Sequence, residues 1–301
     1  MSVLKRKSSI ALITGIIVVL VLMPLWYMML APSLVVSELE KIDLTTSFEG
    51  NLYYFGYGPG SPKFHITIDA HVYAEEVKGD NVILRLDAAM MNITDPDRPN
   101  KLEDFSYNLT YVFNKFTLEN VGDAPEADNN RTGYDPLFPS HLKAGEDINK
   151  VWIENLNTTA TLEFEESVKQ EGVTLYKYSL EKTITKEMTV LPFGLRNFTL
   201  TSTKTILIEP LSGMQAYTED ETLIVYVHYE QQEPAKLVDL KYESTAEAKD
   251  DGIAEAKTLY DSMQLLDLYI PTIFGAVAII LLVGLAFNTR RLRKKPHSPK
   301  T

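Results

Sequence analysis

The chain has 301 residues, no cysteine and a formal net charge of −12 at pH 7. The lack of cysteine excludes disulfide scaffolds, zinc–thiolate sites and thiol catalysis. The acidic balance argues against a nucleic-acid partner, because phosphate backbones are bound by basic surfaces.

Two apolar stretches lie near the ends of the chain, at residues 10–30 and 268–287. Each has about 20 residues, which matches the hydrocarbon core of a bilayer. Basic tails, residues 1–9 and 288–301, lie between these stretches and the two ends of the chain. Since basic flanks stay in the cytoplasm, we expect two membrane-spanning helices in the plasma membrane and both termini cytoplasmic.

The same topology predicts that residues 31–267 are external. All 41 acidic residues and 20 of the 29 basic ones lie between Glu38 and Asp267, a balance of 20 − 41 = −21. The alternative is that the first stretch is a signal peptide cleaved after Ala31. Met29 at the −3 position and Pro32 just after the site are poor choices for cleavage, so an uncleaved anchor is favoured.

Residues 31–243 show the period-two alternation of half-buried antiparallel strands. Turn-forming residues separate the alternating runs, for example at 78–81 and 95–99. The predicted strands lie at 66–74, 82–90, 107–113, 160–164, 173–180, 203–208 and 223–229. We therefore expect a mainly β external domain, built either as a curved sheet or half-barrel or as a sandwich. Residues 120–150 are rich in Asp, Asn, Pro and Gly and predict a long irregular connection, which could divide the domain into two halves.

A helical pattern begins at Ser244. Ser244-Thr245-Ala246-Glu247 has the spacing of a capping box, and apolar residues then recur at helical intervals. We predict an amphipathic juxtamembrane helix over 244–267 that leads into the second span.

Five Asn-x-Ser/Thr sequons lie in the external segment, more than composition alone would give. They predict N-glycosylation in a host with that pathway. The candidate acceptors are Asn92, Asn108, Asn130, Asn157 and Asn197.

No residue set indicates a catalytic, cofactor or metal site strongly. His65, Asp69 and His71 share one strand face, but a solvated face explains them better than a metal site. The acidic group Asp95, Asp97, Asn100, Glu103 and Asp104 does not fit an EF-hand, and an acidic turn is favoured. Motifs of hydrolases are missing, so we expect a protein that is not an enzyme and has no cofactor. The aromatic residues of the strands, such as Tyr107, Tyr111, Phe113 and Tyr178, are interpreted as core before ligand pocket.

Short motifs resemble an uncharacterised, mainly actinobacterial membrane-protein family labelled porin PorA. They are Arg131-Thr132-Gly133 with Phe138-Pro139, Gly172-Val173 with Tyr176-Lys177-Tyr178, and Ile208-Glu209-Pro210 with Ser212-Gly213. The sequence departs from the family at Tyr134-Asp135, where apolar residues usually follow, and at Ser212, where the family has Thr. The resemblance implies the two-span layout and no established activity. A looser likeness, at the level of fold only, is to the lipid-carrying half-barrels of bacterial envelopes.

Two hypotheses follow for the function. The first is a membrane-anchored cell-envelope protein whose external β domain binds lipid or another apolar ligand, next to membrane lipids. The alternative is a glycosylated structural or adhesive surface module that binds envelope polymers or partner proteins. A cavity between the sheet and the terminal helix would favour the first, and a filled core the second.

Overall fold

A computed structural model describes residues 42–54, 63–128, 131–190, 194–229 and 233–293, with isolated positions between Leu12 and Leu22. Residues 38–260 form one compact unit, and residues 1–37 with 261–301 form a second. The candidate site lies in the first unit. The expected first span, residues 10–30, lies outside the described residues except for those isolated positions.

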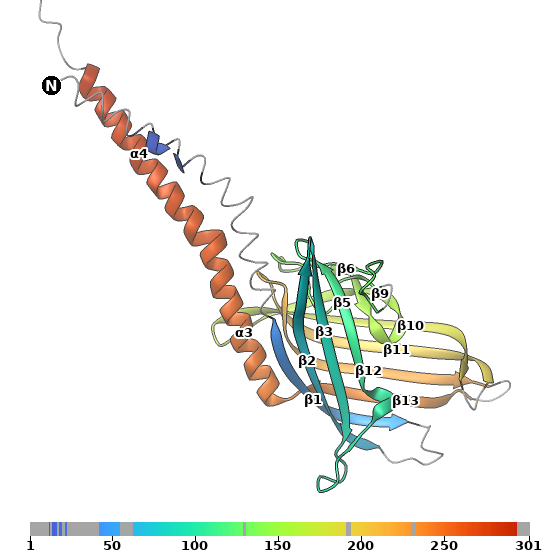
Figure 1. Cartoon of the computed structure of the whole chain (residues 1–301). Helices are drawn as coiled ribbons and strands as arrows, with labels where there is room; N and C mark the ends of the chain where they lie inside the picture. The colour runs from blue at the N-terminus through green and yellow to red at the C-terminus, as the bar shows by residue number, and fades with distance from the viewer. Residues whose placement is uncertain are drawn as a thin grey trace, which may run out of the picture. The chain divides into compact units, whose positions relative to one another are not determined.

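The first unit is dominated by one large antiparallel sheet (Figure 1). Its strands are β1 (Asp43–Tyr54), β2 (Phe64–Lys78), β3 (Asn81–Asn92), β4 (Asn100–Lys101), β5 (Tyr107–Asn114), β6 (Asn120–Val121), β7 (Thr132–Gly133), β8 (Ile148–Ile153), β9 (Thr158–Gln170), β10 (Val173–Val190), β11 (Gly194–Glu209), β12 (Met214–His228) and β13 (Ala235–Ser244).

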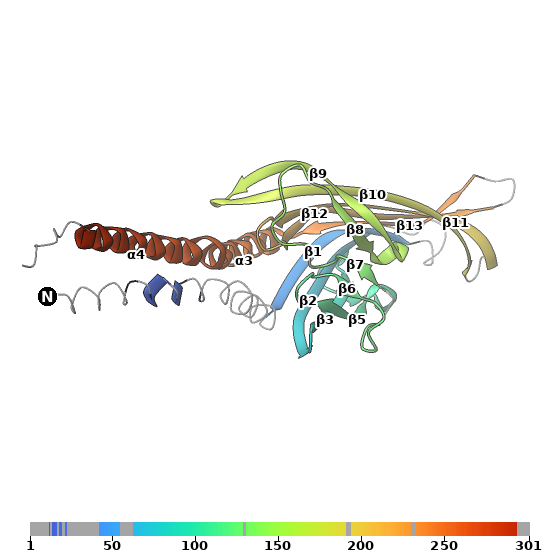
Figure 2. The same cartoon turned by 90° about the horizontal axis from the view of Figure 1, so that it is seen from above.

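The order of the strands is β7-β6-β5-β3-β2-β1-β13-β12-β11-β10-β9-β8, with β4 beside β3. The sheet is strongly curved, and β2, β3 and β5 cross β10, β11 and β12 steeply in both views (Figures 1 and 2). Its two end strands meet at a parallel bridge between Tyr134 and Val151. The Trp152 amide donates to the Tyr134 carbonyl at 2.8 Å there. The sheet is therefore nearly closed on itself, as the expected curved sheet predicts, and is not a sandwich.

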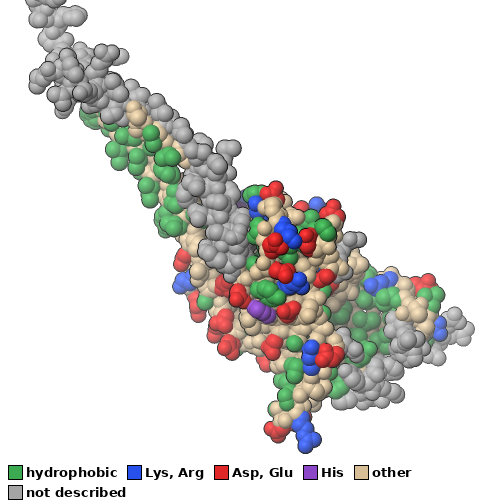
Figure 3. All heavy atoms as spheres, viewed as in Figure 1, with side chains coloured by type: hydrophobic (Ala, Val, Ile, Leu, Met, Phe, Trp, Pro, Cys, Tyr) green, Lys and Arg blue, Asp and Glu red, His purple; other side chains and the backbone are tan. Residues whose placement is uncertain are grey.

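The alternation read from the sequence decides which side chains face inward. Ile66, Ile68 and Ala70 of β2 are buried, while His65 and Asp69, in the opposite phase, are exposed. The inward residues form three adjoining apolar clusters: one from β8 to β12, one around Leu52 and Ile66, and one around Leu84 and Phe113. The outer face carries Lys, Arg, Asp and Glu over much of its surface (Figure 3).

The tight turns follow the residues that permit them. Glu171 and Gly172 both have positive φ, +48° and +89°, and join β9 to β10. A two-residue turn with this backbone matches the twist of paired strands. The predicted turn at 78–81 likewise joins β2 to β3.

The predicted irregular segment 120–150 contributes β6, β7 and the start of β8 to the same sheet. No strand was expected at Ile148–Ile153 or Ala235–Ser244, although β13 pairs with both β1 and β12. The sequence of β13 has charged residues among its apolar ones, so its alternation is weak. Pairing with the neighbouring strands, which a local pattern does not show, stabilises it as a strand.

Helix α3 (Ala246–Gln264) follows β13 and packs on β10, β11 and β12 through Ile253 and Ala256. The expected cap is wrong by one residue. The Thr245 hydroxyl accepts the amide of Ala248 at 3.2 Å, whereas the Ser244 hydroxyl is buried and accepts the Thr218 amide at 3.0 Å. Ser244 therefore bonds to the neighbouring strand and does not cap the helix, and the sequence pattern could not show this contact.

The second unit contains a π-helical turn, Leu265–Tyr269, and helix α4, Ile270–Arg293. Pro271 lacks the amide hydrogen of a regular helix and crowds the preceding turn, and a wider π turn relieves this. Among the described residues, one helix is long and apolar enough to cross a bilayer, at Ile270–Phe287. Its side chains are mostly exposed and apolar, as Figure 3 shows along the helix.

Candidate functional site: an internal cavity with an ionic cluster

The curved sheet encloses a cavity of about 460 Å³. This volume lies in the range of small-molecule sites, which are mostly apolar with a few placed polar groups. One wall is apolar and comes from β1, β2, β3 and β5. The opposite wall is polar and comes from β8, the 3-10 helix Glu154–Leu156, β10, β11, β12 and the segment 135–136, with Tyr242 of β13 beside it. The apolar wall includes Phe48, Ile68, Ala70, Val72, Leu86, Ala88 and Leu109, and the polar wall includes Asp135, Glu154, Asn155, Ser202, Lys204, Gln215, Thr218 and Glu221.

The register of the sheet brings the central polar residues together. Lys204 of β11 lies opposite Glu221 of β12, and Glu221 lies opposite Tyr242 of β13. The Tyr242 side chain offsets part of the increase that burial causes in the pKa of Glu221. Tyr242 has room because its neighbour across the next strand pair is Gly50. A Cβ at Gly50 would lie 2.7 Å from the Tyr242 Cα.

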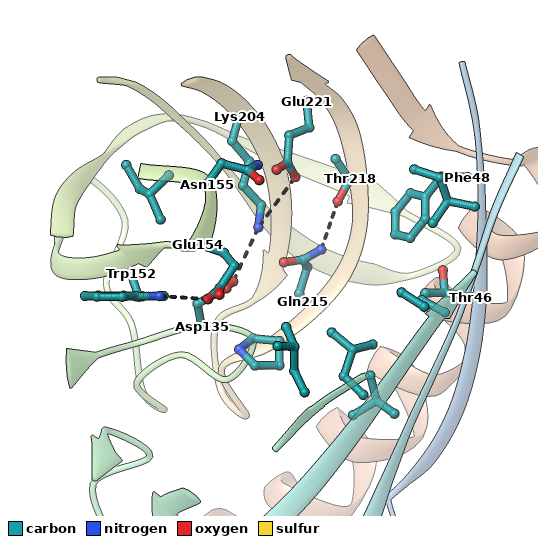
Figure 4. Close-up of a pocket in the computed structure, with 18 of the residues that line it drawn as sticks. Thr46, Phe48, Asp135, Trp152, Glu154, Asn155, Lys204, Gln215, Thr218 and Glu221 are labelled. Carbon is teal, nitrogen blue, oxygen red and sulfur yellow. Dashed lines mark hydrogen bonds and ion pairs between the residues drawn. The ribbon is translucent and has the colours of Figure 1, made fainter. Parts of the chain in front are cut away.

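Asp135 reaches the same cluster from a different part of the chain. It belongs to residues 131–142, a segment that crosses from β7 toward β8 and that we call the strap. Lys204 Nζ lies 3.4 Å from Asp135 Oδ1 and 3.8 Å from Glu221 Oε2 (Figure 4). The three side chains are only 15–16 % exposed. We call Asp135, Lys204 and Glu221 the ionic cluster.

Burial and charge act in opposite directions on the cluster. Burial alone lowers the pKa of Lys204, but Asp135 and Glu221 raise it by more, so the pKa is raised and Lys204 stays charged. Burial raises the pKa of Glu221, and Lys204 offsets part of that increase. Glu221 therefore takes up a proton more readily than an ordinary glutamate.

Tyr107 lines the cavity beside the cluster. Burial raises its pKa to about 12, with contributions from Glu221, Glu154 and Asp135, so its hydroxyl stays protonated. The side chain nevertheless keeps 47 % of its surface accessible. The cavity explains both the raised pKa and the accessible surface. Protein surrounds the Tyr107 ring, but the ring faces the open space of the cavity.

A second ion pair holds the strap to the polar wall. Arg131 Nε donates to Glu154 Oε2 at 2.7 Å, and Trp152 Nε1 donates to the same oxygen at 2.9 Å. The Arg131 side chain is 3 % exposed, and its guanidinium lies 4.2 Å from the ring centre of Tyr111. Arg131 Nη1 also donates to the Thr110 carbonyl at 3.4 Å, whereas its buried Nη2 has no hydrogen-bond partner among the described residues. The pair fixes the wall next to the cluster.

Glycines and the β11–β12 turn fix the rest of the strap. The Phe138 amide donates to the Gly213 carbonyl at 3.2 Å, and a Cβ on Gly213 would lie 2.2 Å from the Phe138 carbonyl oxygen. Glu209 is fully buried, and its carboxylate accepts the amides of Leu211 and Ser212. Two of the motifs singled out in the sequence, at 131–139 and 208–213, thus meet in space, where they shape the strap and its turn.

A smaller cavity of about 150 Å³ lies between α3 and the sheet. It shares Thr46, Phe48 and Gln215, among others, with the larger cavity, so the two adjoin. Its lining is mostly apolar, and from α3 it includes Ala248 and Gly252 together with the acidic residues Asp251 and Glu255. Figure 4 shows Phe48 and Thr46 on the side of the cavity opposite Lys204 and Asp135.

The structure places the candidate glycosylation sites separately from this cavity lining. Asn108, Asn157 and Asn197 are exposed, Asn92 is half-buried at the end of β3, and Asn130 lies outside the described residues.

The residues considered for metal binding are not brought together. The His71 ring contacts Asp43, the Asp69 carboxylate accepts the Ser47 hydroxyl, and the His65 ring contacts the Gly50 carbonyl. In the acidic turn, Asp95 accepts the amide of Asp97, and Glu103 pairs with Lys101. No group of three metal-binding side chains occurs among the described residues.

The ionic cluster was missed in the sequence, although a signal was present. Lys204 occupies the inward phase of β11, two residues from Ser202 and Ile206, and both of these are buried. A charge in an apolar phase is the pattern that marks an internal polar site. The aromatic set also divides: Phe113 and Tyr178 are buried in the core, whereas Tyr107 and Tyr111 line the cavity.

Comparison with known families gives one match of nearly full length. The family model described as Porin PorA matches residues 9–287. No curated protein matches the chain.

Proposed function

Because the chain belongs to the Porin PorA family, we propose that it is a membrane-anchored cell-envelope protein whose sheet-enclosed cavity binds an apolar ligand. Family membership and the apolar helix Ile270–Phe287 support the membrane association. The observation that carries the binding role is the cavity of about 460 Å³ with an apolar wall and an adjoining space under α3.

The sheet is proposed to lie outside the membrane. A membrane barrel has an outward apolar band and a polar interior. Here the inward residues form apolar clusters, and outward positions such as His65, Asp69 and Arg85 are polar. With a second span at residues 10–30, both termini would be cytoplasmic and residues 31–267 external, in the plasma membrane. The basic tails at both ends support that orientation.

A binding role is favoured over catalysis because the two cations at the polar wall, Lys204 and Arg131, are each held by carboxylates. Lys204 lies between two carboxylates, and Glu154 accepts from both Arg131 and Trp152. We infer a protein that holds or transfers its ligand without changing it.

Tryptophan fluorescence tests the proposal directly. The chain has two tryptophans, Trp26 and Trp152, and Trp152 lines the cavity. In the full-length Trp26→Phe variant, purified in detergent, Trp152 is the only tryptophan. A brominated alkyl compound that enters the cavity should quench its fluorescence in a saturable way, and mass spectrometry of the purified protein should find a retained apolar compound.

Two phenylalanine variants separate cavity binding from non-specific uptake. Ala88 is buried and lines the cavity, whereas its neighbour Ala89 has the opposite phase of β3. Ala88→Phe should abolish saturable quenching, and Ala89→Phe should leave it unchanged. Equal quenching in both variants, or none in the parent protein, would remove the proposal.

The alternative is a glycosylated adhesive or structural module that binds envelope polymers. The exposed sequons at Asn108, Asn157 and Asn197 favour it. It would be supported if Ala88→Phe had no effect on any property of the protein while loss of the sequons weakened surface attachment.

A further inference from the structure

The polar wall of the cavity holds more carboxylates than cations. Arg131 is bonded to Glu154 and is neutralised by it. Among the described cations, Lys204 is the one that faces both Asp135 and Glu221, so these three groups sum to −1 when all are ionised. An uncompensated negative charge is costly in a buried site unless a cation or a proton joins it.

The geometry leaves acceptor capacity for an added cation. A direct charge-assisted hydrogen bond has a length of about 2.7–2.9 Å, and both contacts of Lys204 Nζ, at 3.4 and 3.8 Å, are longer. The two carboxylates therefore share one ammonium loosely. Tyr107 adds an aromatic ring and a hydroxyl that has no hydrogen bond to another described residue. Aromatic faces attract cations as well.

The lining also gives the ligand a direction. Away from the ionic cluster, the cavity passes Phe48 and adjoins the space under α3, whose lining is mostly apolar but includes Asp251 and Glu255. Burial raises the pKa of Glu255, which favours its neutral form. Figure 4 shows the cluster and Phe48 on opposite sides of the space. One end of the cavity suits a polar head and the other an alkyl chain.

We propose that the ligand is an amphiphile with a positively charged head, held at Asp135 and Glu221, and with an alkyl chain that runs past Phe48 toward α3. The inference rests on the proposed function and specifies its ligand class. An anionic head would meet two carboxylates at the same place and is disfavoured.

Three probes with the same brominated dodecyl chain test the head group: an ammonium, an alcohol and a carboxylate. They are titrated at pH 7 into the full-length Trp26→Phe protein, with Trp152 fluorescence as the readout. The ammonium should bind at least about tenfold more tightly than the carboxylate. The alcohol should lie between them.

Neutralising the carboxylates should invert the order. In Asp135→Asn/Glu221→Gln, Lys204 is the remaining charge of the cluster, so the carboxylate probe should bind more tightly than the ammonium. The matched control is Glu49→Gln/Glu163→Gln, which removes the same charge from exposed strand positions. It should keep the order of the parent protein.

The outcomes separate the two proposals. If no probe binds, the apolar-ligand function itself fails. If all three bind equally in the parent protein, or if the double variant keeps the parent order, the charged-head inference is overturned and the apolar-ligand function stands. The alcohol reports whether the double variant is folded. If the double variant no longer binds the alcohol probe, the single variants Asp135→Asn and Glu221→Gln take its place. Each must then lower the affinity for the ammonium probe relative to the alcohol probe, or the inference is wrong.

The orientation is tested by moving the bromine along the ammonium probe. Trp152 lies in the polar wall, bonded to Glu154. Bromine next to the head should therefore quench more strongly than bromine at the chain end. The reverse result would overturn the proposed direction.

Discussion

The seating of α3 on the sheet depends on Gly252. A Cβ at this position would lie 1.8 Å from the carbonyl oxygen of Ala216 in β12, where ordinary contacts exceed 3 Å. In a free helix, Gly→Ala stabilises by about 1 kcal/mol. Here the added Cβ needs about 1 Å or more of extra separation to reach an ordinary contact distance, so α3 must move away from β12. This movement loosens the packing of Ile253 and Ala256, which are 7 % and 0 % exposed.

Full burial of one large apolar side chain contributes about 1.5–3 kcal/mol, and overpacking costs about 1–3 kcal/mol. We therefore expect Gly252→Ala to destabilise the protein by about 1–2 kcal/mol after the gain in helix propensity. The assay is denaturant unfolding of the full chain in detergent, followed by Trp152 fluorescence in the Trp26→Phe background. The matched control is Ala254→Gly at an exposed position of the same helix, which should cost about 1 kcal/mol. A Gly252→Ala protein that is as stable as its parent or more stable would refute the packing of α3 on β12.

Three further predictions concern the strap and the ionic cluster. Gly213→Ala should destabilise strongly, because its φ is +77° and its Cβ would strike the strap. Gly172→Ala, with φ +89° and open space around it, should cost only about 1 kcal/mol for the strained backbone, as thermal unfolding would show. Arg131→Met should cost about 3–5 kcal/mol, since it leaves the carboxylate of Glu154 without its cation. Glu154→Gln should rescue part of that loss in the double variant, and strictly additive effects would contradict the pairing. For Glu221 the folded pKa lies above the ordinary value of 4.5, so the folded state binds the proton more tightly. Its contribution to stability is present at low pH and falls as the pH rises from about 4.5 through the folded pKa. Glu221→Gln should remove that fall, and its stability relative to the parent should grow with pH over the same window. A difference that is constant with pH would contradict the raised pKa.

Local sequence patterns were sufficient for the strands that alternate cleanly. In β2 and β3 the apolar phase is unbroken over Ile66–Ala74 and Val82–Met90, and the structure buries that phase. The apolar run at 268–287 predicted a helix in the same way, and α4 covers most of it, with side chains that are mostly exposed. Each of these elements contains its own signal, because the period or the length of an apolar run is a local property of the sequence.

Strands without such a pattern needed their neighbours. Strand β13 carries Lys236, Asp239 and Lys241 among its apolar residues, and each of these charges has a partner within β13 or on the adjacent β12. Because strand pairing is long-range, its stabilisation cannot be read from ten consecutive residues.

The amino-acid sequence by itself determined the apolar run that becomes α4, the inward phase of the strong strands and the lack of cysteine chemistry, since these depend on composition or on residues close together in the chain. Only the tertiary structure decided that the sheet curls until its ends meet at Tyr134 and Val151 and encloses a cavity. It also brought Asp135, Lys204 and Glu221 together across 86 residues of chain, from position 135 to position 221. Register and closure depend on contacts between distant segments, and the free energy of a buried charge depends on partners that no local pattern contains.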